Sequence, residues 1–206
     1  MVVFSTLLKT INYNSGQIMD TYPTKHARAF QQLYQMYHRQ EEAFRTAFIK
    51  LYSFRQADPH FVQHYFDLLE HYRRQPPSDL RAMLNTLFGR QPLRPLSPSH
   101  FAQFSYMANL LNPQHPVFSK ALAGLLGFRP PVQSRSNHRL RVQLYLEFYK
   151  SLTGLYLKLQ HDKQLYPLLK AIGILLKSEG IYLHTAKKFD LLMQHVAVLH
   201  QEGKLI

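Results

Sequence analysis

Residues 58 to 89 read DPHFVQHYFDLLEHYRRQPPSDLRAMLNTLFG, and the pattern in this stretch indicates the class of fold. An aspartate followed by a proline, Asp58-Pro59, is typical of a helix start, because the carboxylate caps free backbone N–H groups and proline suits the first turn. Apolar side chains then recur at helical spacing up to a pair of prolines that must end the helix. A second amphipathic run begins after Ser78, which we expect to cap it, and ends at Gly89. The stretch therefore predicts two helices that form a hairpin.

Helical periodicity extends along nearly the whole chain, whereas the alternation typical of strands is almost absent. The sequence therefore predicts an all-α protein with about eight helices. We expect them at residues 24–52, 59–75, 79–88, 98–111, 116–126, 138–160, 165–178 and 185–201, with a further short helix at 3–11.

Two of the predicted hairpins are similar in sequence. His60-Phe61-Val62-Gln63 corresponds to His100-Phe101-Ala102-Gln103, an offset of 40 residues (60 to 100). Leu87-Phe88-Gly89 corresponds to Leu125-Leu126-Gly127, an offset of 38 residues (87 to 125). This period resembles the roughly 40-residue unit of HEAT-like repeats, in which stacked hairpins bury a continuous core. Stacked antiparallel hairpins are therefore the predicted architecture, although two units with few identities can also arise by chance.

A basic connection is expected at residues 129–138, where prolines and serines interrupt the helical periodicity. It separates a helical-hairpin region at 1–128 from a C-terminal three-helix subdomain at 139–206, although the two parts can also pack as one domain. All 13 arginines lie at or before Arg141, whereas most lysines follow it, and this change in composition supports the boundary.

Composition excludes several classes of protein. The 206 residues contain no cysteine, which excludes disulfides, thiol catalysis and thiolate metal sites. No apolar run approaches the roughly 18 residues of a membrane span, so we expect no membrane insertion. The first residues lack a basic region and a small-residue cleavage site, so we expect no secretory signal and a cytoplasmic protein. No glycine-rich phosphate loop or nucleophile elbow is present, so we expect no cofactor and no catalytic residues.

The charge balance is strongly basic, with 25 Lys and Arg against 12 Asp and Glu and a net charge of +13. Residues 80 to 146 contain no carboxylate at all. Six arginines of this region fall in or beside two predicted connections, and a stack of hairpins would align them along one edge. Arginine binds phosphate through a planar fork, so they predict contact with nucleic-acid phosphates. The six are Arg90, Arg94, Arg129, Arg135, Arg139 and Arg141.

Two further basic pairs are candidate anion contacts. Arg73-Arg74 follows Tyr72, and Lys187-Lys188 lies at the start of the last predicted helix, where free N–H groups favour phosphate. Two aromatic residues are candidates for stacking on bases: Tyr72, because it lies beside Arg73-Arg74, and Tyr106, because we expect it on the outer side of its helix. Most other aromatics lie at core spacing.

His60, His64, Asp67 and His71 fall on one strip of a helix, and histidines four residues apart have metal-ligand spacing. A third well-placed ligand and a nearby general base are missing from the pattern. We therefore expect no metal site, and a metal-dependent hydrolase that uses this strip is kept only as an alternative that metal analysis can exclude.

The sequence thus predicts a non-enzymatic, basic helical protein that binds nucleic acid through arginine-rich connections. The alternative is an adaptor or scaffold that binds an acidic protein and uses exposed aromatics as anchors. The choice among DNA, RNA and acidic protein stays open at this point, as does the oligomeric state.

Overall fold

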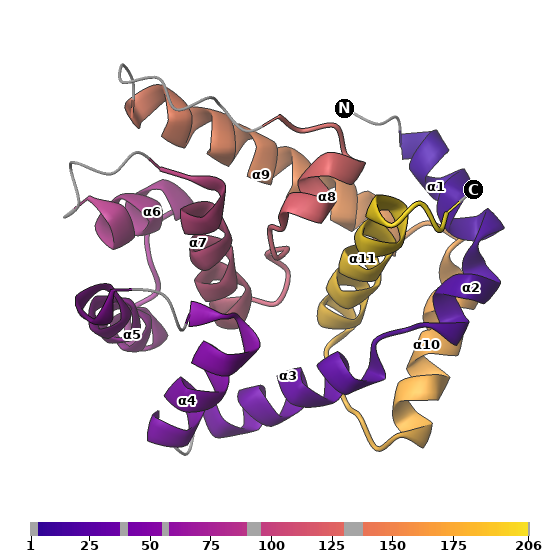
Figure 1. Ribbon diagram of the computed structural model, residues 1–206, viewed down its shortest axis with the longest axis horizontal. Helices are drawn as coiled ribbons and strands as arrows, with labels where there is room; N and C mark the ends of the chain where they lie inside the picture. The colour runs from indigo at the N-terminus through magenta and orange to yellow at the C-terminus, as the bar shows by residue number, and fades with distance from the viewer. Residues whose placement is uncertain (1–3, 38–40, 55–57, 90–95, 130–137, 206) are drawn as a thin grey trace.

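The computed structural model describes residues 4–37, 41–54, 58–89, 96–129 and 138–205 (Figure 1). Its regular secondary structure is entirely helical in these residues, so the predicted all-α class is confirmed. Eleven helices are described: α1 Phe4–Tyr13, α2 Ser15–Asp20, α3 Thr24–Tyr37, α4 Glu41–Leu51, α5 Pro59–Arg74, α6 Leu80–Phe88, α7 Pro98–Leu111, α8 Lys120–Leu125, α9 His138–Gln160, α10 Tyr166–Ser178 and α11 Thr185–Gln201.

Local capping residues mark the starts of several helices. The carboxylate of Asp58 accepts the N–H of His60 at 2.9 Å, as predicted for the start of α5. The expectation that Ser78 caps α6 is wrong, because Asp79 accepts the N–H of Ala82 at 2.7 Å. Helix α8 begins at Lys120 rather than at residue 116, because the hydroxyl of Ser119 caps it. Three helices end near a glycine with positive φ, namely Gly127, Gly180 and Gly203.

The long helix predicted at residues 24–52 is two helices, α3 and α4, which lie at an angle to each other (Figure 1). Residues 38–40 between them lie outside the described residues. The rings of Tyr37 and Phe44 face each other with centroids 5.1 Å apart, and Phe44 also contacts Phe66 of α5. The change of direction thus lets both halves of one apolar stripe reach the same core. Periodicity alone could not reveal it, because the apolar spacing continues across the break.

The HEAT-like stacking of hairpins is not confirmed. Helices α5, α6 and α7 contact one another, as a first hairpin and its neighbour would. Helix α8, however, packs mainly against α11 instead of forming a hairpin with α7. The segment between α7 and α8 carries the chain away from α7, and its residues Pro116, Val117 and Phe118 are buried.

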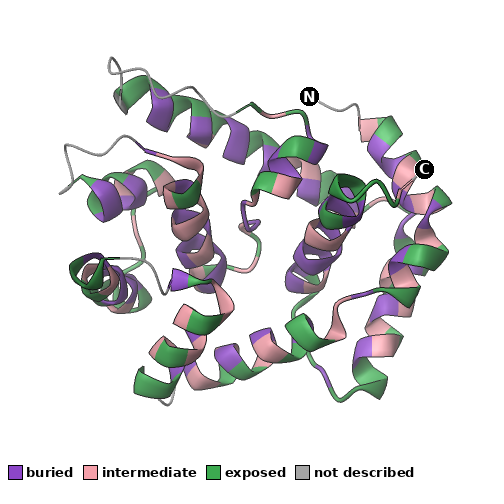
Figure 2. Cartoon of the chain, viewed as in Figure 1, coloured by how far each residue is buried: buried purple, intermediate pink, exposed green. Residues whose placement is uncertain are grey.

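Helix α11 lies at the centre of the fold, where α8, α9 and α10 contact it. Ten of its 17 residues are buried, and purple is the main colour of its ribbon in Figure 2. Nearly all buried apolar residues that the structure describes form one contiguous cluster, from Leu7 of α1 to Leu199 of α11. Both predicted regions contribute to this cluster, and the connection predicted at 129–138 lies mostly outside the described residues. In the part of the chain that the structure describes, no helix is both long and apolar enough to span a membrane.

Candidate anion-binding surface and aromatic pocket

Only some of the predicted anion-binding arginines lie on the surface. Arg129 and Arg139 are exposed. Arg141 belongs to α9, and its relative exposure is only 7%. The expectation that it lies at the edge of an exposed connection is wrong, because it falls on the buried face of α9, one turn before Tyr145. Burial raises the pKa of Tyr145 to about 12, although the positive charge of Arg141 acts in the opposite direction. Three of the six lie outside the described residues: Arg90, Arg94 and Arg135.

Four exposed cations of the acid-free region have no ion-pair partner among the described residues. These unpaired cations are Arg81 on α6, Lys120 on α8, Arg129 and Arg139. All 12 aspartate and glutamate residues of the sequence lie among the described residues, and none of them forms an ion pair with these four cations. The charge of the four cations is therefore not neutralised by a side chain of the protein itself. Helices α6 and α9 contact each other, which brings the helices of Arg81 and Arg139 together.

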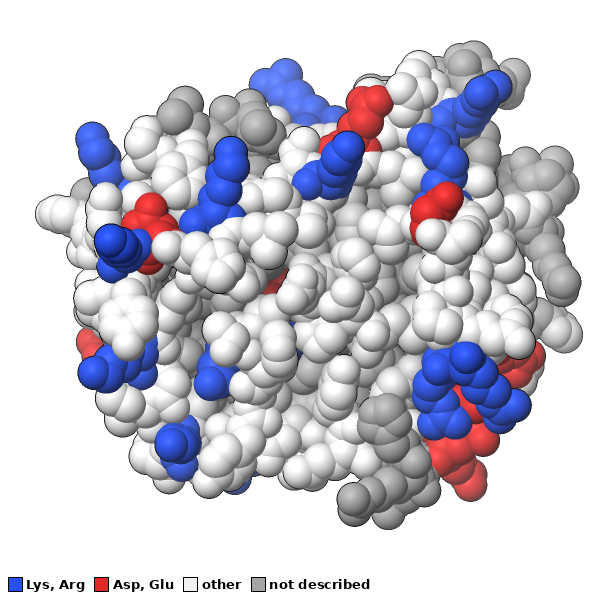
Figure 3. Space-filling model, turned by 180° about the vertical axis from the view of Figure 1, so that it is seen from behind, with Lys and Arg blue, Asp and Glu red and all other residues white. Residues whose placement is uncertain are grey.

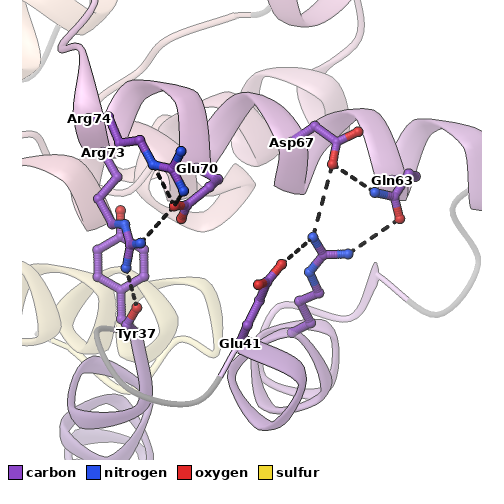
Figure 4. A network of polar contacts seen from close by, with 8 residues as sticks. Tyr37, Glu41, Gln63, Asp67, Glu70, Arg73 and Arg74 are labelled. Atoms are coloured by element: carbon purple, nitrogen blue, oxygen red, sulfur yellow. Dashed lines mark hydrogen bonds and ion pairs between the residues drawn. The ribbon is translucent and has the colours of Figure 1, made fainter.

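Arg73 and Arg74 lie in an internal network instead (Figure 4). The carboxylate of Glu70 accepts hydrogen bonds from Arg73 at 2.7 Å and from Arg74 at 2.8 Å. Arg73 also donates to the backbone carbonyl of Tyr37 at 3.2 Å, which ties α5 to the end of α3. One carboxylate is therefore shared between two guanidinium groups, so both arginines already have an ion-pair partner within the protein.

The tyrosines expected to stack on bases are both engaged in packing. Tyr72 is buried with 8% exposure. Tyr106 is partly buried and stacks on Tyr52, with ring centroids 4.1 Å apart. The expectation that Tyr106 lies on the outer side of its helix is therefore wrong, and the burial of Tyr72 leaves its ring covered.

The histidine strip of α5 lies near the surface. The side chain of Asp67 accepts a hydrogen bond from Gln63 at 2.7 Å and lies 4.0 Å from the guanidinium of Arg45 (Figure 4). His64 lies 3.2 Å from the carbonyl of Thr86, while His60 and His71 are exposed. Across the described ranges, no group of three or more His, Cys, Asp or Glu side chains is arranged to hold a metal ion.

Lys187 is buried, which corrects the expectation of a phosphate contact at the start of α11. Its Nζ donates to Asn109 Oδ1 at 2.7 Å and to Asp190 Oδ2 at 2.9 Å, and lies 3.9 Å from the ring centroid of Phe30. Burial lowers the pKa of Lys187, and the negative charge of Asp190 opposes this effect. Lys188, the second predicted contact, is partly exposed.

The same buried network satisfies the backbone of the segment between α7 and α8. Asp190 Oδ1 accepts the N–H of Val117 at 3.0 Å, and Gln194 donates to the Val117 carbonyl at 2.6 Å. Three other side chains bind the segment: Asn109 donates to the His115 carbonyl at 2.6 Å, Tyr149 to the Pro116 carbonyl at 2.7 Å, and Ser105 accepts the Phe118 N–H at 2.8 Å. A buried irregular segment needs such partners, since unpaired backbone groups are costly. The network therefore has a structural role.

A pocket of about 490 Å³ opens beside Lys187, between α3, Pro113 and the residues that precede α11. Phe30, Tyr34 and Tyr182 supply aromatic walls, and Gln35 and His184 supply polar groups. We call this the aromatic pocket. The pocket could not be predicted from the sequence, because its walls come from three segments that are far apart in the chain.

The outer side of α10 carries cations that alternate with large apolar side chains. Tyr166, Lys170, Ile174 and Lys177 lie on one side of the helix at helical spacing, and Lys163 lies in the turn just before it. Tyr166 and Ile174 are 65% and 61% exposed. We call these five residues the α10 face. Seen from behind, lysine and arginine side chains are spread along the margin where α10 lies, with a few acidic side chains among them, and acidic and basic side chains also lie together near α4 and α5 (Figure 3).

Neither protein-family models, nor curated proteins, nor solved structures show a match to this chain.

Proposed function

We propose that this chain is a non-enzymatic binding protein that contacts nucleic-acid phosphates. The observation that carries the proposal is the set of unpaired cations, Arg81, Lys120, Arg129 and Arg139, in a region without carboxylates. Excess positive charge destabilises a compact protein through self-repulsion, and a polyanion removes that repulsion. Phosphate neutralisation also releases counterions, which favours binding at low salt.

Salt-dependent binding of labelled oligonucleotides, followed by fluorescence anisotropy, tests this proposal. If the four cations each contact one phosphate, they contribute roughly −3 to the slope of log affinity against log salt. The quadruple variant Arg81→Ala, Lys120→Ala, Arg129→Ala, Arg139→Ala should lose that share of the slope. Single-stranded and duplex DNA and RNA are compared in parallel, because phosphate contacts alone do not distinguish them.

The matched control removes the same amount of charge from cations that already have carboxylate partners. It combines Arg28→Ala, Arg45→Ala, Arg74→Ala and Lys204→Ala, whose ion pairs span 2.7 to 2.8 Å. We expect this variant to keep most of the slope. Equal losses in the two variants would mean that net charge alone drives binding, and the proposed contact surface would be rejected.

An acidic protein partner is the second candidate, and the α10 face favours it. Exposed Tyr166 and Ile174 are suited to act as apolar anchors, while the three lysines around them complement acidic side chains. A labelled acidic amphipathic helix is the probe. We expect Tyr166→Ala to weaken its binding and to leave oligonucleotide binding unchanged. If Tyr166→Ala has no effect on the peptide, this candidate fails.

We also propose a HEAT-like stacking of hairpins and a cytoplasmic location for this protein. Mutual packing of α5, α6 and α7 supports a repeat-like arrangement in that part of the chain.

The non-enzymatic assignment is tested by metal analysis of purified protein, since stoichiometric metal that is lost on His64→Ala would favour a metal-dependent hydrolase.

A further inference from the structure

We propose that the aromatic pocket binds a planar, uncharged heteroaromatic ring of about nucleobase size. The inference does not rest on the proposed phosphate contacts, because the unpaired cations lie on α6, α8, α9 and the segment after α8, and none of them lines this pocket. Its volume of about 490 Å³ lies within the roughly 300–1,000 Å³ typical of small-molecule sites.

The pocket is held open by bonds between its walls. The side-chain amide of Gln31 on α3 donates to the carbonyl of Gly180 at 3.4 Å, and its oxygen accepts the N–H of Tyr182. The hydroxyl of Tyr34, also on α3, donates to the carbonyl of Leu110 at the end of α7 at 3.4 Å. Three segments are thus fixed around a space that their side chains leave unfilled, so a ligand would find the site largely preformed.

Its walls favour a flat ring. Tyr34 is partly exposed and packs against the buried ring of Phe30, with centroids 5.8 Å apart and planes inclined by 36°. Tyr182 is 68% exposed, which leaves its ring accessible to a ligand at the pocket. Offset or tilted stacking on such rings is favourable for any planar π-system.

The polar groups favour an uncharged ring with hydrogen-bonding edges. Carboxylates are absent from the lining, and the charge of Lys187 is balanced by buried Asp190. His184 Nδ1 accepts the N–H of Ala186, so its neutral ring carries the proton on Nε2 and can donate from there. The amide of Gln35 supplies both a donor and an acceptor. Nucleobases combine a flat neutral ring with such edges, either as free nucleosides or at an unpaired position of a strand.

Ligand-observed NMR with adenosine on the full chain tests the inference, with cyclohexanol as an apolar molecule that lacks a planar ring. We expect adenosine to bind and cyclohexanol to bind much more weakly. Tyr182→Ala should weaken adenosine binding by roughly 5- to 150-fold, the range measured for loss of one stacking partner. Tyr182→Phe should retain most of the binding, since stacking needs the ring and not the hydroxyl.

Tyr166→Ala is the matched control, because Tyr166 is 65% exposed but lies on α10 away from the pocket lining. It should leave adenosine binding unchanged. Equal effects of Tyr182→Ala and Tyr166→Ala, or equal binding of adenosine and cyclohexanol, or no adenosine binding at millimolar concentration, would each overturn the inference. Oligonucleotides with and without an unpaired adenine then distinguish a strand from a free nucleoside. Adenosine binding without any oligonucleotide binding would reject the proposed function and leave this inference intact.

Discussion

Lys187 illustrates how a charged side chain is accommodated in an aromatic core. Its ammonium group pairs with the carboxylate of Asp190, donates a hydrogen bond to the amide oxygen of Asn109 and lies over the ring of Phe30. A buried ion pair contributes little net stability compared with apolar residues, but loss of one member leaves an uncompensated charge. The Lys187–Asp190 pair should therefore affect the stability of the protein mainly when one of its two members is removed.

We expect Lys187→Met to lower the free energy of unfolding by about 3–5 kcal/mol, because Asp190 would be left buried without its counter-charge. Adding Asp190→Asn should recover much of that loss, since an amide oxygen can still accept the N–H of Val117. The control Lys188→Met, at the partly exposed neighbour, should change stability by no more than about 0.5 kcal/mol. Urea unfolding followed by circular dichroism measures all three, and equal effects of Lys187→Met and Lys188→Met would contradict the role assigned to the pair.

At the scale of elements, the segment between α7 and α8 depends on neighbours that are distant in sequence. Side chains of α7, α9 and α11 bind its backbone, and it directs α8 toward α11. It also carries His115, whose pKa is lowered by burial. A proton on this ring would be poorly solvated in the folded protein.

Stability should therefore fall under mildly acidic conditions. Because the pKa of His115 is lower in the folded than in the unfolded chain, the unfolded state binds more protons between the two values. The stabilising contribution is complete above about pH 6.5 and is lost as pH falls through the folded pKa. His115→Gln should flatten this dependence in part, since burial also lowers the pKa of His26 and His195. Thermal unfolding of both proteins between pH 5 and pH 8 measures this pH dependence of stability. If the pH dependence is the same in the His115→Gln variant, His115 does not contribute to it.

For the molecule as a whole, one core unites the two regions that composition suggested. Helix α11 packs against α8, α9 and α10, and its side chain Lys187 bonds to Asn109 of α7. Tyr22, just before α3, donates to the carbonyl of Lys188 at 3.1 Å, which ties the N-terminal part to the same helix. The C-terminal helix is thus a central element.

We expect a fragment of residues 1–137 to fail to fold, because it would expose the apolar surfaces of α3 and α8 that α9 to α11 cover. The full chain should unfold in a single transition that is identical by circular dichroism and by tyrosine fluorescence. Amide hydrogen exchange of the fragment is the decisive measurement. A fragment with protected amides would show two independent domains and contradict the single core.

Most helix positions could be predicted from the sequence because their causes are local. Ser97-Pro98 and the Gly180 and Gly203 ends lie within a turn of the helices that they bound, and apolar periodicity marks the buried side of each helix. The excess of positive charge and the acid-free region are likewise properties of the sequence alone.

Partners and exposure were not predictable, because they depend on which distant segments meet. Arginine and lysine usually lie on the surface of a protein, yet the packing of α9 and α11 buries Arg141 and Lys187. The break between α3 and α4 leaves the apolar period intact, so only the position of α5 reveals why the chain turns there. The aromatic pocket exists only where α3, Pro113 and Tyr182 come together, since no single segment contains its walls.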